Sequence, residues 1–234
     1  MAVSNHIKHI FFDLDRTLWD FEKSAEQAFE KIFEKHKLGD FGVPSGTAFH
    51  DTYTIHNERL WDQYRKGEIK KEVLRGLRFN LTLKDFGIVN NDLGEAIGDD
   101  YVKISPLLVN LFPYAIEILE YLKENYTLHI ITNGFAEVQA VKLRESKMKK
   151  YFDQIITSEE AGVKKPDPNI FTFAFDKSGA KPEESIMIGD DYEVDIVGAQ
   201  NMNMEQIFFD PYNLQPHASC SYRITNLEEI KGIL

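Results

Sequence analysis

Four apolar runs in this sequence lead to side chains that can serve as acids, nucleophiles, hydrogen-bond donors or metal ligands, three of them directly and the third through a short segment that contains Gly162. A single aspartate in such a place can simply cap the helix that follows it. Four polar clusters in succession are poorly explained in that way, and they indicate one site assembled from distant parts of the chain. The clusters are Asp13-Leu14-Asp15-Arg16-Thr17, Thr132-Asn133-Gly134, Lys164-Lys165-Pro166-Asp167-Pro168, and Gly189-Asp190-Asp191 with Asp195.

The aspartates of the first and fourth clusters are suited to a hard metal ion. Asp13 and Asp15 are two residues apart, so in an extended strand both face the same side. Carboxylates at close quarters repel each other and partly take up protons unless a cation lies between them. Asp190 and Asp191 bring further oxygen ligands without a neighbouring cysteine or histidine. An oxygen-rich site of this kind favours Mg²⁺, which is the predicted cofactor.

The second and third clusters supply donors for a phosphoryl group. Such a group is stabilised by donors on its equatorial oxygens, and the Thr132 hydroxyl, the Asn133-Gly134 backbone and a lysine can provide them. Lys164 and Lys165 are adjacent, so only one is expected to point inward. Pro166 favours an extended conformation of the residue before it, which would hold Lys165 fixed. A lysine pair alone more often faces solvent, so this interpretation depends on the other clusters.

Short apolar runs alternate with helix-like segments over most of the chain and position these clusters. Strands that alternate with helices predict an α/β fold, in which a parallel sheet is covered by helices on both faces. Ligands bind at the carboxyl ends of the strands of such sheets. The predicted strands are His9–Phe12, Thr127–Thr132, 154–157, 185–188 and Glu205–Phe209, and the predicted helices between them are 113–125, 136–147, Pro168–Ser178 and 193–201.

The alternation is interrupted once, after the first cluster. From Thr17 to about Asn110 the pattern is almost wholly helical, and turn-forming clusters separate the segments. We therefore expect a helical domain inserted after the first strand. The expected boundaries are 1–17 with 108–234 for the α/β core and 18–107 for the insertion. The predicted helices of the insertion are 21–36, 47–66, 69–86 and 92–104.

Composition and charge exclude several classes of function. The net charge of −11 disfavours binding to nucleic acid and to anionic membranes. The single cysteine, Cys220, excludes an internal disulfide and a thiolate zinc site. The N-terminal residues do not resemble a signal peptide, and no apolar run has the length of a membrane span. These features predict a cytoplasmic protein without a membrane or nucleic-acid partner, and either a monomer or a weak dimer.

Taken in order, the four clusters resemble the four motifs of haloacid dehalogenase-like hydrolases. The resemblance extends over residues 8 to 200. It implies a Rossmann-like core, and the inserted helical segment resembles the α-helical cap of that superfamily. Haloacid dehalogenases themselves lack the second acid of the first motif and the metal, whereas Asp15 is present here. The resemblance therefore implies a phosphatase.

The same resemblance implies specific roles for the clustered residues. Asp13 would attack phosphorus and form an aspartyl-phosphate, and Asp15 would protonate the leaving group and then activate water. Mg²⁺ would be held by Asp13, the backbone carbonyl of Asp15 and Asp190, with Asp195 in the outer shell. Thr132 and Lys165 complete the expected catalytic set, and Thr17, Asn133 and Gly134 are expected to bind the substrate.

A closer resemblance concerns the substrate. The segments 60–69, 131–135 and 158–162 are similar to pyrimidine 5′-nucleotidases that act on non-canonical nucleoside monophosphates. It implies a small phosphorylated partner, a nucleoside 5′-monophosphate. Trp61 and Tyr64 could stack on its base. Their spacing of three also suits packing within the helical domain, which is the favoured interpretation.

Other functions remain compatible with the motifs. A phosphatase of sugar phosphates or a phosphomutase would use the same acids. A non-catalytic binding protein would be expected to lack Asp13 or Asp15, and both are present.

Overall fold

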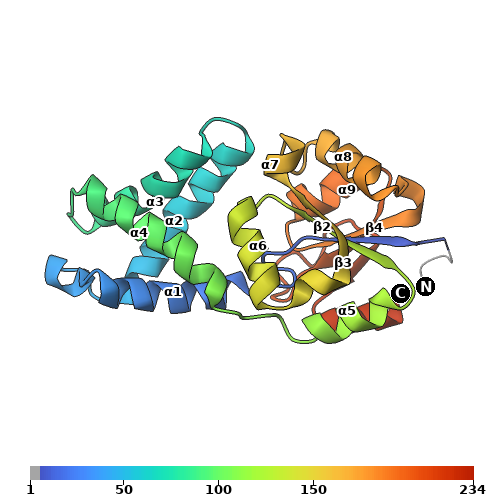
Figure 1. The fold of residues 1–234 in the computed structure, drawn as a ribbon, viewed down its shortest axis with the longest axis horizontal. Helices are drawn as coiled ribbons and strands as arrows, with labels where there is room; N and C mark the ends of the chain where they lie inside the picture. Colours follow the sequence, from blue (N-terminus) through green and yellow to red (C-terminus); the bar gives the residue numbers. More distant parts are fainter. Residues whose placement is uncertain (1–5) are drawn as a thin grey trace. The chain divides into compact units, whose positions relative to one another are not determined.

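The computed structural model describes residues 6–234, which form two compact units (Figure 1). Within these residues, the first unit contains 6–21 and 110–234, and the second contains 22–109. The first is an α/β unit around a six-stranded sheet, and the second is helical. The predicted fold class, a Rossmann-like core with an inserted helical cap, is confirmed.

The sheet of the first unit is parallel throughout, with strand order β3-β2-β1-β4-β5-β6. Its first strand, β1, lies between β2 and β4, so the residues that follow these three strands meet at one edge. Phe12 of β1 pairs with Ile130 of β2 and with Ile188 of β4. The strands are β1 (His9–Phe12), β2 (Thr127–Thr132), β3 (Phe152–Thr157), β4 (Ser185–Gly189), β5 (Glu205–Phe209) and β6 (Tyr222–Ile224).

Both faces of this sheet are covered, as a parallel sheet requires. On one face Ile10 and Phe12 pack in a core with apolar residues of α5 (Ala115–Lys123). On the other, Phe11 packs with residues of α8 (Pro168–Ser178) and α9 (Gly198–Gln200). Figure 1 shows α5 on one side of the sheet and α8 and α9 on the other. The alternation of side chains along β1 thus divides the core between the two faces.

The helical unit contains α1 (Phe21–Lys35), whose first residue belongs to the other unit, α2 (Gly46–Arg65), α3 (Lys71–Asp85) and α4 (Asn91–Ile104). Its core is aromatic: the rings of Phe29, Tyr53, Phe79 and Tyr101 contact one another. Ser45 and Asn90 cap α2 and α4 through side-chain oxygens.

The predicted elements occur, with differences of a few residues at several ends and with short elements that were not predicted, such as α7 (Ser158–Ala161). Strand β3 begins two residues before the predicted start, and β6 was not predicted. The expected helix at 193–201 consists of a π-helical turn, Tyr192–Val197, followed by α9. Within residues 6–234, none of the helices has the length and apolar character needed to span a bilayer.

Candidate active site

The turn after β1 carries the two aspartates of the first cluster. Asp13 N donates to Ile188 O of β4, which extends the pairing of β1 beyond its last residue. The chain then turns, and Arg16 N donates to Trp19 O. Arg16 has φ of 64°, in the left-handed region that glycine adopts most easily. The guanidinium of Arg16 lies 4.8 Å from the ring centroid of Phe21.

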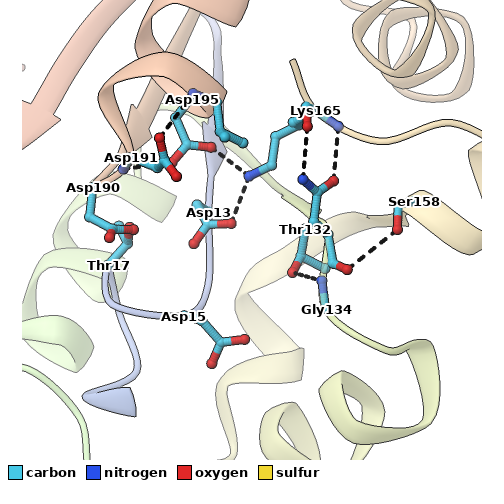
Figure 2. A network of polar contacts seen from close by, with 12 residues as sticks. Asp13, Asp15, Thr17, Thr132, Gly134, Ser158, Lys165, Asp190, Asp191 and Asp195 are labelled. Carbon is cyan, nitrogen blue, oxygen red and sulfur yellow. Dashed lines mark hydrogen bonds and ion pairs between the residues drawn. The ribbon is translucent and has the colours of Figure 1, made fainter. Parts of the chain in front are cut away.

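A buried lysine joins the first cluster to the fourth. Lys165 Nζ lies 2.6 Å from Asp13 Oδ1 and 2.6 Å from Asp195 Oδ1, and the lysine is only 1% exposed (Figure 2). Of the two adjacent lysines, Lys165 is therefore the one that points inward. Its position also depends on Asn133, whose amide nitrogen donates to Lys165 O and whose amide oxygen accepts from Lys165 N.

The turn after β4 places the acids of the fourth cluster. Asp191 accepts from Val194 N and caps the π-helical turn, so it is a structural acid in this arrangement. Asp195 follows on that turn and accepts from Asp191 N. A Cβ on Gly189 would collide with the Asp195 carboxylate, which explains the glycine at this position. Asp190 accepts from the Thr17 hydroxyl at 3.2 Å, so Thr17 lies against the acid cluster.

Burial and mutual repulsion perturb these acids. Burial raises the pKa of Asp13 to about 7, although Lys165 opposes the shift. Burial followed by the charges of Asp13 and Asp195 raises the pKa of Asp190 well above its usual range. Burial alone would lower the pKa of Lys165, but the two adjacent carboxylates outweigh it and raise that pKa. Lys165 contacts two of the three acids, and without further positive charge the cluster takes up protons.

This donor set fits a divalent cation. Asp13, Asp190 and Asp195 each offer an oxygen, and the three oxygens lie within 4.8 Å of one another. Carboxylate oxygens without sulfur or imidazole are the ligands of Mg²⁺. The pKa values of these acids are raised because the carboxylates are buried and repel one another. A cation bound among them would stabilise their ionised forms. Asp195 belongs to this group of oxygens as well as to the lysine contact, whereas the sequence placed it in the outer shell.

Two residues that the sequence analysis did not select complete the cluster. Gln139 and Lys142, on α6 (Ala136–Glu145), both donate to the Asp15 carboxylate. The Asp15 carboxylate lies apart from the contacts between Lys165, Asp13 and Asp195 (Figure 2). Gln139 also donates to Thr132 Oγ1, and so does Gly134 N. The only signal for these residues is that polar side chains three apart would share one helix face.

Trp61 and Tyr64 belong to α2 of the helical unit. Their rings contact each other edge to face, with centroids 5.5 Å apart, and Tyr64 is buried. The predicted site residues of the α/β unit are brought together, and Trp61 and Tyr64 contact each other within the helical unit.

The fold and this cluster define a class of protein. The family model of haloacid dehalogenase-like hydrolases matches residues 7–203, and the chain belongs to this family. Relatives that are named as nucleotidases and phosphatases confirm the prediction of a phosphatase enzyme.

The chain is 30% identical to the pyrimidine 5′-nucleotidase YjjG of Escherichia coli strain K12, over 96% of each chain. It is 31% identical to a glyceraldehyde 3-phosphate phosphatase of Methanothermobacter thermautotrophicus, over 86% of this chain and 84% of the relative. Among solved structures, the putative hydrolase YfnB of Bacillus subtilis bound to magnesium has a TM-score of 0.86. It is 25% identical, over 97% of this chain and 98% of that one. The predicted resemblance to nucleotidases is confirmed.

Proposed function

We propose that the protein is a Mg²⁺-dependent phosphomonoesterase that acts through an aspartyl-phosphate on Asp13, with pyrimidine nucleoside 5′-monophosphates as its preferred substrates. The observation that carries the reaction is the buried contact of Lys165 with both Asp13 and Asp195. It holds one oxygen of the nucleophile, and the other oxygen accepts no hydrogen bond from residues 6–234. The similarity to YjjG over the full length supports the substrate class.

The residues divide the reaction into two displacements. In the first, an oxygen of Asp13 attacks phosphorus as the bond from phosphorus to the leaving oxygen breaks, and that oxygen takes a proton from Asp15. In the second, Asp15 accepts a proton from water as the water oxygen attacks phosphorus. The bond from phosphorus to Asp13 then breaks and phosphate leaves.

The other residues bind and orient. The Thr132 hydroxyl and the Lys165 amine are donors for the phosphoryl oxygens, and Asn133 fixes the backbone of Lys165. Asp13, Asp190 and Asp195 would hold Mg²⁺, which supplies positive charge against the phosphoryl oxygens when bound. Thr17 orients Asp190 through its hydroxyl.

A phosphatase for small sugar phosphates is the second candidate. It is favoured by the 31% identity to an archaeal glyceraldehyde 3-phosphate phosphatase, which is no lower than the identity to the nucleotidase. The acids described here serve either substrate equally, because both are phosphomonoesters.

One panel tests both candidates. Phosphate release is measured from pyrimidine and purine nucleoside monophosphates, glyceraldehyde 3-phosphate, other sugar phosphates and an aryl phosphate, with and without Mg²⁺. We expect Mg²⁺-dependent release that is greatest with a pyrimidine nucleotide and disappears in Asp13→Asn. The matched control is Asp176→Asn, at an exposed position of α8, which should retain full activity. Release that persists in Asp13→Asn contradicts the covalent mechanism, and a preference for sugar phosphates selects the second candidate.

A further inference from the structure

Helix α6 presents two polar side chains to Asp15 from one face. Gln139 and Lys142 are three residues apart, and they are 1% and 3% exposed. Gln139 Nε2 lies 2.7 Å from Asp15 Oδ2, and Lys142 Nζ pairs with Asp15 Oδ1. Both carboxylate oxygens of Asp15 are therefore held by donors from one rigid element.

The Lys142 amine is buried against two aromatic rings and the Asp15 carboxylate. Its amine lies 5.2 Å from the ring centroid of Trp19 and 5.6 Å from that of Phe21, and Asp15 is the acid that it contacts. The two rings attract the amine, but a largely buried ion pair often stabilises a fold no more than apolar residues of the same size would. The arrangement is better explained by what Lys142 does to Asp15 than by its contribution to the core.

Gln139 links Asp15 to the phosphate-binding threonine. Its amide nitrogen must face Asp15, because a carboxylate only accepts hydrogen bonds. The same nitrogen lies 2.9 Å from Thr132 Oγ1, and Gly134 N lies 3.0 Å from that oxygen. These two donors occupy both acceptor positions of the hydroxyl, so its hydrogen is left to donate elsewhere.

The glycine of the second cluster belongs to this arrangement. A Cβ on Gly134 would collide with Nε2 of Gln139, and other atoms of the Gln139 side chain would also be too close. Glycine at 134 therefore admits the Gln139 amide to its place between Thr132 and Asp15. The absence of a side chain at Gly134 thus leaves the space that the Gln139 side chain of α6 occupies.

We propose that Gln139 and Lys142 are positioning residues for the reaction, a proposal that rests on the function proposed above. They hold the Asp15 carboxylate in the orientation from which it accepts a proton from water, and Gln139 also directs the Thr132 hydroxyl toward the phosphoryl group. Because both residues bind the carboxylate form of Asp15, their main effect falls on hydrolysis of the aspartyl-phosphate. Neither residue touches the substrate in this role.

The test separates the two displacements. The substrate is 4-nitrophenyl phosphate, because its weakly basic leaving group departs without a proton and the first displacement does not need Asp15. The variants are Lys142→Met and Gln139→Met, which have unbranched side chains of similar length and remove the donors. Arg144→Met is the matched control, since Arg144 lies on the same helix, is exposed and pairs with its neighbour Glu145.

We expect the variants to release one equivalent of nitrophenolate per enzyme in a rapid burst. A steady rate about 10²-fold below that of the unaltered enzyme should follow, the lower end of what a general base contributes. Intact-mass spectra of quenched samples should show the phosphorylated chain accumulating in the variants and not in Arg144→Met. Thermal melts establish that each variant is folded, and the neutral, unbranched methionine side chain is close in size to those of glutamine and lysine.

The outcomes are distinct. A uniform loss of rate without a burst or phosphorylated chain would assign the two residues a structural role and overturn the inference. Unchanged kinetics would overturn it as well. If the unaltered enzyme released no phosphate from any ester, the proposed function itself would fail.

Discussion

The side-chain nitrogen of Lys165 lies 2.6 Å from Oδ1 of Asp195, and both residues are almost completely buried. The same nitrogen contacts Asp13 at the end of β1, so one cation connects the residue that follows β1 with the π-helical turn after β4. Removal of one partner from a buried ion pair leaves the other charge uncompensated, and this costs far more than the pair contributes. The lysine is thus important to the architecture of the site, in addition to the phosphoryl binding proposed for it.

Lys165→Met is expected to abolish most of the activity and to destabilise the metal-free protein. The loss of a donor to the developing charge typically reduces kcat about 10²- to 10³-fold. Two buried carboxylates without their cation should lower the free energy of unfolding by about 3 kcal/mol. Steady-state kinetics and denaturant unfolding measure the two effects.

The neighbouring lysine provides the control for that variant. Lys164→Met should retain activity within a few-fold, because it is Lys165 whose amine lies between Asp13 and Asp195. Equal losses in both variants would show that the charge of this loop, and not the buried contact, supports the reaction.

Binding of Mg²⁺ is expected to strengthen as pH rises through about 7. Burial raises the pKa of Asp13 from 3.8 to about 7, and that of Asp190 is also raised, so protons compete with the metal in acid. A raised carboxyl pKa stabilises the metal-free fold below about pH 4, and this contribution is lost as pH rises toward 7. The increase in Tm on adding Mg²⁺ should therefore be larger at pH 8 than at pH 5.

The control for the metal prediction is Asp190→Asn, which removes one of the three oxygen ligands. It should decrease the Tm shift at pH 8 while the protein stays folded. A shift of equal size at pH 5 and pH 8 in the unaltered protein would contradict the linkage between metal and protons.

The positions of the acids were predictable from sequence because each follows a strand that is a continuous apolar run. The bounds of β1, β2 and β5 agree with the prediction for that reason. Strand β6 has only three residues and a single buried one, so it offers no run to detect. Strand β3 was predicted two residues short, since the exposed Asp153 interrupts its apolar pattern.

The parts of the site that the sequence did not indicate depend on contacts between residues that are far apart in the chain. Gln139 and Lys142 have ordinary helical spacing, and their partner Asp15 lies 127 positions before Lys142. The π-helical turn is likewise set by tertiary contacts, because Asp195 must face Lys165 while Asp191 caps the turn. Local propensity contains no information on either requirement.

Gly189→Ala should damage the site from within the sheet. The added Cβ would meet the carboxylate of Asp195, which cannot yield easily because Lys165 and the Asp191 amide hold it. We expect a loss of about 1–3 kcal/mol, typical of overpacking, and a decrease in kcat of at least tenfold. Differential scanning calorimetry and kinetics with a saturating substrate measure these quantities.

A second glycine separates the steric effect from the effect of the substitution itself. Gly179 ends α8 with φ of 71°, and an added Cβ there meets no atom within 4 Å. Gly179→Ala should cost about 1 kcal/mol through backbone strain alone and leave kcat unchanged. If Gly189→Ala resembled it in both measurements, Asp195 would have to be freer than its contacts indicate.

His129, buried in β2, is expected to make stability fall as pH decreases from about 6.5 to about 4. Burial, with a smaller effect of the adjacent His9, lowers the pKa of His129 from 6.5 to about 4. The unfolded chain therefore binds a proton in this range that the folded protein binds poorly, so the contribution is complete above pH 6.5 and lost toward pH 4. The full change amounts to about 3 kcal/mol.

The measurement is the difference in unfolding free energy between the unaltered protein and His129→Gln at several pH values, since the contributions of the acid cluster cancel in that difference. The difference should favour His129 more at pH 7 than at pH 4.5, and a pH-independent difference would show that the His129 ring titrates equally in the folded and unfolded states.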